Sequence, residues 1–467
     1  MPASRAGAIS IISAAFLLRA CVQTRKLVDK EPSQVCTQSA VTRTHTGTHA
    51  MDYLENVLSC ESAPSAAEPE VLAMVGPPLP SIVVYDGLGI FEKRKERING
   101  APSFSLVGGD EMICLWRVLN DFEGWFIGNR EYIGKAHGSF RVRGAQPTPD
   151  VAGAHWEVVS ADGKEWAEAP GVRCISGEAV QAGLDAAPKT MALVGSTPHH
   201  LQRDCLGLFE RTDKIVNGYP LYALVGNETR DLLWHVGSCW IVGNRPDIGS
   251  NVGGMVACDG ALRPDAVQAP WAVMGLQNEW VAAPNVEVIV GSKLNFELSS
   301  AARTVALVGA TPRAQNGFLG VFERMTRTVN GLATYRMKSD DPDAPPVLLW
   351  HANACWLVGS MAESSSHRDG AQLRVSDGAL RPECIEAMWE VWDDKQDAWV
   401  EAPALRCLPR HAVVKAVEEV EMKDELIRRL EVSSKGGAGG QRMRRTASAV
   451  TAIRAEGVFG RGRVQRL

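Results

Sequence analysis

The chain has 467 residues, and its 49 Lys and Arg residues against 54 Asp and Glu residues give a formal net charge of −5. A chain of this length holds about two to four domains, and 45% hydrophobic with 22% charged residues excludes a chain that is disordered throughout. The mild negative charge argues against a nucleic-acid binder that works through overall charge. No run of about 18 apolar residues is present, so no membrane-spanning helix is expected.

Residues 1–70 predict a targeting-like and flexible leader. Residues 1–28 contain no acidic residue, and basic residues lie on both sides of the apolar run 8–18. A basic start before a short apolar run is typical of a signal peptide, and a start without acidic residues also suits an organelle transit peptide. A start that is merely disordered is the alternative. Residues 29–70 are polar and unpatterned, which indicates a flexible segment.

Three segments of the chain are copies of one another, at 71–177 (repeat 1), 191–290 (repeat 2) and 304–408 (repeat 3). Each copy continues from a Gly-containing start into a Leu-Gly-x-Phe-Glu string, an Asn-Gly pair, a Leu-Trp pair and a Trp-x-x-Gly string. All thirteen tryptophans lie inside these copies, and each copy closes on two tryptophans and an Ala-Pro pair. Self-similarity at a fixed spacing indicates tandem domains. The segments between the copies, 178–190 and 291–303, are therefore expected to be the protease-sensitive joints.

Each repeat predicts antiparallel β-structure. Its apolar runs are short, rich in Val, Leu and aromatic residues, and separated by Gly, Asn, Asp and Pro. The Asn-Gly pairs at 99–100, 217–218 and 330–331 favour tight hairpins because both residues tolerate positive φ. The fold expected is mainly β, with three tandem small antiparallel β-domains, each a barrel or sandwich. A single propeller is the alternative, but its blades would repeat at about 40–45 residues, and that shorter period is absent.

The chain changes character again after repeat 3. Apolar residues at helical spacing predict a helix over 409–432 that either caps repeat 3 or binds a partner. Residues 433–467 form a Gly linker and a basic tail, and both ends of the chain are expected to be disordered. The arginine-rich part, 441–467, is the one segment for which nucleic-acid binding is considered, against the alternative of a solvated tail.

The eleven cysteines follow no pattern shared by all three repeats. A disulfide framework common to the repeats places cysteines at the same positions in each copy, but Cys174/Cys407 and Cys239/Cys355 each recur in only two. No Cys-x-x-Cys string is present, so no zinc site is expected. We therefore expect buried thiols in a reducing compartment, which favours the cytoplasm, while the leader leaves an organelle or a secreted destination open.

Several recurrent side chains are candidates for binding. The Leu-Trp pair is followed by a histidine in repeats 2 and 3, where repeat 1 has Arg117, and a string Asp-Gly-Ala-Leu-Arg-Pro occurs at 259–264 and 377–382, where repeat 1 has the degraded copy 143–150. Gly and Pro make the latter string typical of a turn. A packing role is favoured for the histidines and a core role for most tryptophans. The candidate binding residues are Trp116, Trp234, Trp350, His235, His351, Arg263 and Arg381.

No recognised catalytic motif is present in the sequence, so no catalytic residue, cofactor or metal ligand is assigned. The hypothesis is a non-enzymatic binding or scaffold protein whose repeated β-domains bind a protein partner through avidity; an enzyme with scattered site residues stays open. The alternative is a glycan-binding or carbohydrate-active protein, in which exposed aromatic rings, Trp116, Trp234 and Trp350 among them, stack on sugars.

The recurring strings also resemble a known kind of repeat. The Asn-Gly, Leu-Trp, Trp-x-x-Gly and Asp-Gly-Ala-Leu-Arg-Pro strings are similar to the tandem Trp-rich repeats of large uncharacterised proteins in unicellular algae and other protists. The resemblance covers about 71–408 and implies no particular activity. Repeat 1 departs from it at 143–150, which puts a ligand site shared by all three repeats in doubt.

Overall fold

The computed structural model of the chain describes most of the three repeats and little beyond them. The described residues are 68–77, 87–109, 112–119, 122–150, 153–160, 163–227, 231–311, 315–339, 341, 343, 345–360, 370–412, 414–415 and 422. Of the predicted leader, 1–70, only 68–70 are among them, and Glu68 and Glu70 form ion pairs with Lys93. The Gly linker and the basic tail lie outside the described residues. Within the described part, no helix has the length and apolar character needed to cross a membrane.

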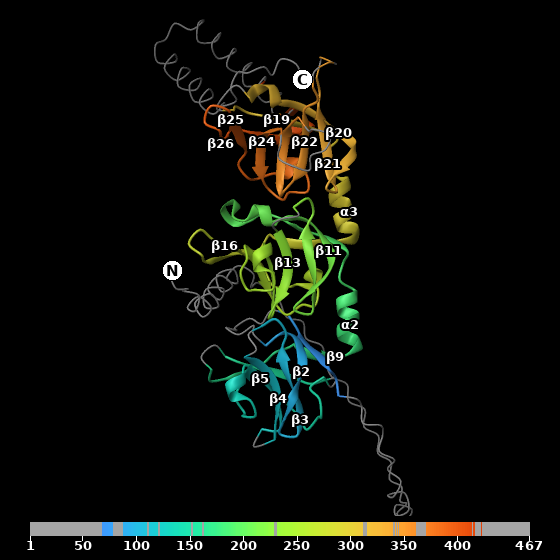
Figure 1. Cartoon of the computed structure of the whole chain (residues 1–467), viewed down its shortest axis with the longest axis vertical. Helices are drawn as coiled ribbons and strands as arrows, with labels where there is room; N and C mark the ends of the chain where they lie inside the picture. The colour runs from blue at the N-terminus through green and yellow to red at the C-terminus, as the bar shows by residue number, and fades with distance from the viewer. Residues whose placement is uncertain are drawn as a thin grey trace, which may run out of the picture.

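Each repeat forms one curled antiparallel sheet of nine strands, a half-barrel (Figure 1). Eight consecutive strands pair with their neighbours in chain order, and the ninth returns to pair with the first. The first sheet contains β1 (Val71–Val75), β2 (Gly89–Ile98), β3 (Ala101–Leu106), β4 (Ile113–Val118), β5 (Gly124–Asn129), β6 (Phe140–Arg143), β7 (Trp156–Val159), β8 (Trp166–Glu168) and β9 (Arg173–Ser176).

The other two sheets repeat this order. The second contains β10 (Thr190–Val194), β11 (Gly207–Val216), β12 (Tyr219–Leu224), β13 (Asp231–Val236), β14 (Cys239–Asn244), β15 (Met255–Cys258), β16 (Trp271–Met274), β17 (Trp280–Ala283) and β18 (Glu287–Val290). The third contains β19 (Thr304–Val308), β20 (Gly320–Val329), β21 (Leu332–Met337), β22 (Leu348–Ala352), β23 (Cys355–Gly359), β24 (Ala371–Ser376), β25 (Glu390–Asp393), β26 (Ala398–Glu401) and β27 (Arg406–Pro409).

Short helices connect the sheets and some of the strands. The helix α2 (Glu178–Asp185) follows the first sheet and α3 (Gly291–Ser299) follows the second, so the segments that we expected to be joints are partly helical. The 3-10 helices are η2 (Arg130–Tyr132), η3 (Pro198–His200), η4 (Arg203–Cys205), η5 (Arg245–Asp247), η6 (Pro264–Ala266), η7 (Gln315–Phe318) and η8 (Pro382–Cys384). Of the helix predicted over 409–432, Pro409 is instead the last residue of β27, and the other described residues, 410–412, 414–415 and 422, are helical.

The hairpins form where the sequence predicts them. Asn217 and Gly218 have φ angles of 53° and 80° between β11 and β12, and Asn99 and Asn330 have the same φ of 53° in the corresponding turns. Asparagine and glycine tolerate this left-handed backbone, and the resulting turn matches the twist of the two strands. The three long strands β2, β11 and β20 therefore start their hairpins in the same way.

The core of each sheet is built on tryptophan. Trp125, Trp240 and Trp356 are at most 1% exposed, and the indole N–H of Trp240 donates to the carbonyl of Ala261 at 2.8 Å. The other two indoles make the corresponding bonds to the turns of their own repeats. A buried indole needs such a partner for its N–H, so this bond attaches the turn after β6, β15 or β24 to the core of its sheet.

The prediction of a mainly β fold with three tandem antiparallel domains is therefore confirmed, with half-barrels as the observed form. Each repeat forms one sheet of nine strands and not two blades of four, so the described strands do not form a single propeller.

The expectation of thiols throughout the chain is wrong at one place. Cys239 and Cys258, which face each other across β14 and β15, form a disulfide bond. The comparison between repeats could not identify this pair, because Cys258 is replaced by Ser376 in repeat 3 and by Arg143 in repeat 1. Disulfide bonds persist in oxidising environments, so the cysteine argument for a reducing compartment no longer holds.

Candidate functional site: the joints between the repeats

The three sheets stand in a row along the long axis of the molecule, with α2 and α3 on the same side (Figure 1). Repeat 1 contacts repeat 2 at one joint, and repeat 2 contacts repeat 3 at another. The hydrophobic cores run across both joints: Ala73 and Ile90 belong to the core cluster of repeat 2, and Ala192 and Leu208 belong to that of repeat 3. The repeats therefore share buried apolar surface, which makes them more than independent domains on a string.

The turns of the Asp-Gly-Ala-Leu-Arg-Pro strings form the centre of each joint. At the second joint, the amide of Gly378 donates to the carbonyl of Arg203 at 3.0 Å. A Cβ atom at Gly378 would lie 1.9 Å from the carbonyl oxygen of Leu206, and one at Gly260 would lie 2.5 Å from Cβ of Leu88. Glycine is needed at both positions because the backbone of the neighbouring repeat lies directly against it.

The Asn-Gly turns form a second contact at each joint. A Cβ atom at Gly108 would lie 2.3 Å from the side chain of Asn217, and one at Gly226 would lie 2.3 Å from the side chain of Asn330. At the second joint the amide of Asn353 also donates to the carbonyl of Gly226 at 2.8 Å. Since the same parts of each repeat meet at both joints, the stacking geometry recurs along the chain.

The second joint contains a buried ion pair. Arg203 donates through two nitrogens to the two carboxylate oxygens of Asp377, at 2.7 and 2.8 Å, and through a third contact of 2.9 Å to Glu386. Arg203 is 3% exposed and Asp377 is fully buried. A two-point bond between a guanidinium and a carboxylate fixes both distance and orientation, so this pair sets the angle between repeats 2 and 3.

Asp377 and its counterpart Asp259 also hold their own turns in place. Asp377 accepts bonds from the amides of Ala379, Glu386 and Ala387, and Asp259 accepts corresponding bonds in repeat 2. Burial raises the pKa of Asp259, although these amides act in the opposite direction. Both aspartates are therefore structural elements of the joint turns.

Two candidate binding residues, Arg263 and Arg381, lie beside the connecting helices. Arg263 donates to the carbonyl of Ala186, directly after α2, at 3.2 Å. Arg381 forms a 3.0 Å ion pair with Glu297 of α3 and a bond to Ser300. The side chains are 32% and 24% exposed, so their described contacts attach the connecting helix to the joint turn while part of each guanidinium faces solvent.

The candidate histidines lie inside the repeats. His235 is fully buried, stacks on Tyr219 at 3.7 Å between ring centroids, and meets Trp240 edge to face. Burial lowers the pKa of His235 to about 3 and that of His351 to about 4, the latter against a raising effect from nearby Asp377. Both imidazoles are thus neutral at pH 7 and act as packed aromatic groups.

The candidate tryptophans are also interior. Trp116, Trp234 and Trp350 are fully buried. The indole N–H of Trp116 donates to the carbonyl of Lys135 at 3.0 Å and that of Trp234 to Ser250 at 2.8 Å. None of the three rings is on the surface, so they contribute to the cores and do not form a shared aromatic face.

Repeat 1 departs from the pattern at the end that has no preceding repeat. Arg117 replaces the buried histidine and bonds to Glu123 at 3.3 Å. By strand register, Arg143 stands where repeats 2 and 3 have Cys258 and Ser376, so Gly144 and not Arg143 holds the position of the buried aspartate. Arg143 is exposed, with its guanidinium 4.4 Å from the ring of Phe122. Both departures therefore lie near the turns whose counterparts in repeats 2 and 3, such as Gly237 and Gly378, contact the preceding repeat.

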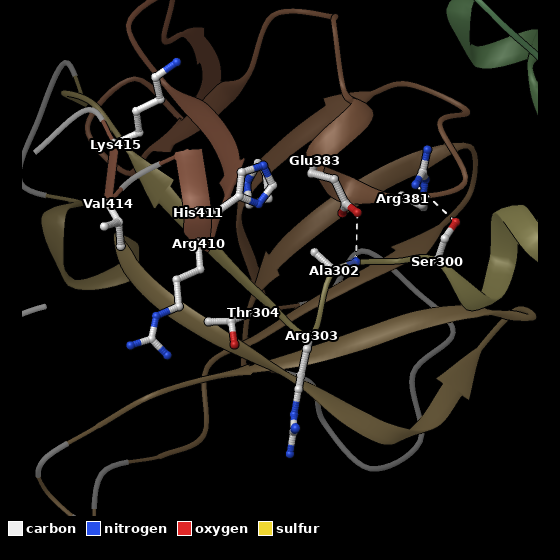
Figure 2. Close-up of a pocket in the computed structure, with 11 residues that line it drawn as sticks. Ser300, Ala302, Arg303, Thr304, Arg381, Glu383, Arg410, His411, Val414 and Lys415 are labelled. Carbon is white, nitrogen blue, oxygen red and sulfur yellow. Dashed lines mark hydrogen bonds between the residues drawn. The ribbon is translucent and has the colours of Figure 1, made fainter. Parts of the chain in front are cut away.

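One open depression lies beside the start of the C-terminal helical residues (Figure 2). Glu383 accepts the amide of Ala302 at 2.8 Å at its edge. Arg303, Arg410 and Lys415 line it but extend outward in different directions, as Figure 2 shows. These charges do not converge on one point, so the depression has no binding geometry. Across the described part of the chain, no group of three or more His, Cys, Asp and Glu side chains is arranged to hold a metal ion.

Comparison with known proteins gives no match: no protein-family model, no curated protein and no solved structure is significantly similar to the chain. The resemblance to Trp-rich protist repeats therefore stays untested.

Sequence reasoning missed Arg203 and the joint glycines. A signal was present, because the histidine and the Asp-Gly-Ala-Leu-Arg-Pro string occur only in the two repeats that follow another repeat.

Proposed function

We propose that the protein is a non-enzymatic scaffold that presents three β-domains to a protein partner at fixed spacing. The observation that supports this proposal is that the recurrent polar residues hold the joints between the repeats. Asp259, Asp377, Arg263 and Arg381 bond to the joint turns and connecting helices, which is the role expected of residues that hold modules in register rather than of residues that do chemistry.

The surface available to a partner is also repeated. The strands β2, β11 and β20 begin with largely apolar, buried or half-buried residues and continue into a charged, mostly exposed half, and they lie at corresponding places in the three sheets (Figure 1). A partner that contacts two or three of these faces gains affinity through effective concentration, provided that the spacing matches. Rigid joints keep the faces at a fixed spacing before the partner binds, so less conformational entropy is lost on binding than with flexible linkers.

The glycan-binding alternative requires exposed rings at Trp116, Trp234 and Trp350. Because all three are buried, no observation favours it.

The test compares the wild-type chain with a Gly378→Ala variant in which the second joint is forced open. Partners are captured by chemical cross-linking in cells and their affinities measured with purified components. We expect partners that bridge repeats 2 and 3 to bind the variant at least about tenfold more weakly. Unchanged affinity of every partner for the variant would contradict a function based on fixed spacing.

A further inference from the structure

Both ends of the row of repeats expose surfaces that the internal joints cover. At the first joint, Leu88 and Ile90 are 0% and 3% exposed, and at the second, Leu206 and Leu208 are 1% and 5% exposed. In each case the following repeat lies on them. The corresponding residues of repeat 3 are Leu319, Gly320 and Val321, and all three are only partly buried.

The glycine at the second position of this face, Gly89 in repeat 1 and Gly320 in repeat 3, also shows that, within the described part of the chain, a neighbouring repeat contacts the first face and not the second. A Cβ atom at Gly89 would lie 2.5 Å from the carbonyl oxygen of Gly237 in the next repeat. At Gly320 the nearest atom is Sδ of Met337, 3.8 Å away and in the same repeat. Among the described residues, the outer end of repeat 3 is therefore a joint face with no neighbour on it.

The outer end of repeat 1 corresponds to the face with which repeats 2 and 3 contact the repeat before them. A Cβ atom added at Gly218 would lie 3.4 Å from Ile90 of repeat 1, and one added at Gly331 would lie 2.8 Å from Leu208 of repeat 2. A Cβ atom added at Gly100, the counterpart in repeat 1, would have no atom within 4 Å. Leu119 follows β4 at the position that Gly237 holds in repeat 2, where the hairpin contacts the preceding repeat, and it is 48% exposed. Leu119 is thus exposed at the outer end of repeat 1, whereas the corresponding residue of repeat 2 contacts the preceding repeat.

The two free ends also differ in charge. Arg143 is exposed at the end of repeat 1. The loop between β21 and β22 carries the exposed residues Asp341 and Asp343, and the corresponding loop of repeat 2 contains Gly226, which contacts Asn330 at the second joint. Glu123 pairs with Arg117 at the first end and Lys338 pairs with Glu323 at the second. The further charges, Arg143 at one end and the two aspartates at the other, are opposite in sign and favour head-to-tail contact over contact between like ends.

We propose that the chain associates head to tail with a second copy of itself, the outer end of repeat 1 docking on the outer end of repeat 3. The occupant follows from the chain's own architecture, since this face is covered twice within one molecule by the equivalent face of the next repeat. Such an interface joins two different surfaces, so association continues into open chains rather than stopping at a symmetric dimer. This inference does not depend on the proposed partner-binding function.

The test uses the full-length protein and two substitutions on opposite ends, Leu119→Glu and Val321→Glu. Sedimentation velocity over a range of concentrations should show the wild-type chain growing beyond a monomer. Each variant alone should associate at least about tenfold more weakly, because a carboxylate would be buried in an apolar contact. Leu276→Glu is the matched control, since Leu276 is 91% exposed in the hairpin between β16 and β17 and lies at neither end.

Mixing the two variants tests the polarity and shows that both are folded. The Leu119→Glu chain keeps an intact repeat 3 end and the Val321→Glu chain keeps an intact repeat 1 end, so the mixture should form a dimer and stop there. A wild-type chain that stays monomeric, a Leu276→Glu variant as impaired as the other two, or a mixture that forms no dimer would each overturn the proposal.

Discussion

Replacing Gly378 by alanine should open the joint between repeats 2 and 3 while leaving the three sheets intact. The added Cβ atom would lie 1.9 Å from the carbonyl oxygen of Leu206 and 2.8 Å from the amide nitrogen of Gly207. Ordinary contact begins near 3.4 Å, so the two repeats must separate by about 1.5 Å. Both contacts are with backbone, which cannot rotate away as a flexible side chain does.

Moving repeats 2 and 3 apart lowers the free energy of unfolding by an amount that can be estimated from two contributions. Overpacking of a tight contact costs about 1–3 kcal/mol. A shift of this size also lengthens the bonds of 2.7 and 2.8 Å between Arg203 and Asp377 beyond hydrogen-bonding distance. Breaking a buried ion pair costs about 3–5 kcal/mol when the remaining charge stays buried, but an opened joint admits water, so we expect about 3 kcal/mol in total.

Urea titration and limited proteolysis measure this effect. In the wild-type chain, the segment 291–303 should resist cleavage because Arg381 attaches α3 to the joint turn. In the variant, cleavage there should release repeat 3, and its unfolding should separate from that of repeats 1 and 2. The control is Gly317→Ala, because a Cβ atom at Gly317 has no atom within 4 Å. Wild-type stability and protease resistance in Gly378→Ala would refute the reasoning.

Three further predictions concern charge, pH and redox state. Asp377→Asn should cost about 2 kcal/mol more in free energy of unfolding than Asp259→Asn. Both substitutions weaken an acceptor for backbone amides, but only the former removes the buried carboxylate that pairs with Arg203 and leaves it the half-exposed Glu386 alone; equal losses in urea titrations would contradict this. The pKa values of His235 and His351, about 3 and about 4, are below the ordinary 6.5, so the unfolded state binds more protons and stability should fall as the pH drops below 6.5, by about 2 kcal/mol per histidine at pH 5. Replacing both histidines by glutamine should remove that pH dependence, and a slope unchanged by the replacement would show that other groups cause it. Reduction of the disulfide bond of repeat 2 should lower the free energy of unfolding by about 3 kcal/mol, and identical denaturation curves with and without a dithiol would show that the bond adds no stability.

The elements that local sequence determines could be predicted. The Asn-Gly hairpins, the short strands and the number of domains follow from turn chemistry and from self-similarity, which need no knowledge of distant contacts. The disulfide bond could not be found by asking which cysteines recur, because Cys258 has no cysteine counterpart in the other repeats.

The joints could not be predicted because their contacts connect residues far apart in the chain. Arg203 and Asp377 are separated by 174 positions, and neither spacing nor propensity indicates that they meet. The core role favoured for most tryptophans agrees with the buried candidate rings, whereas the sequence offers no reason for Arg117 and for the degraded copy at 143–150. Among the described residues no other repeat packs against that end of repeat 1, so the described contacts there do not require a neutral histidine or the Asp-Gly turn of repeats 2 and 3.

The three repeats form one row that is held together by structured joints. Hydrogen exchange of the amides of Asn353 and Gly378 in the full-length chain tests it most directly. Both residues lie outside strands, and both donate to a carbonyl of the preceding repeat, Gly226 and Arg203 respectively. If the joints are structured, these amides should exchange as slowly as those within β22 and β24. Exchange at the rate of an exposed loop, while the strand amides stay protected, would contradict the account and leave three independent domains.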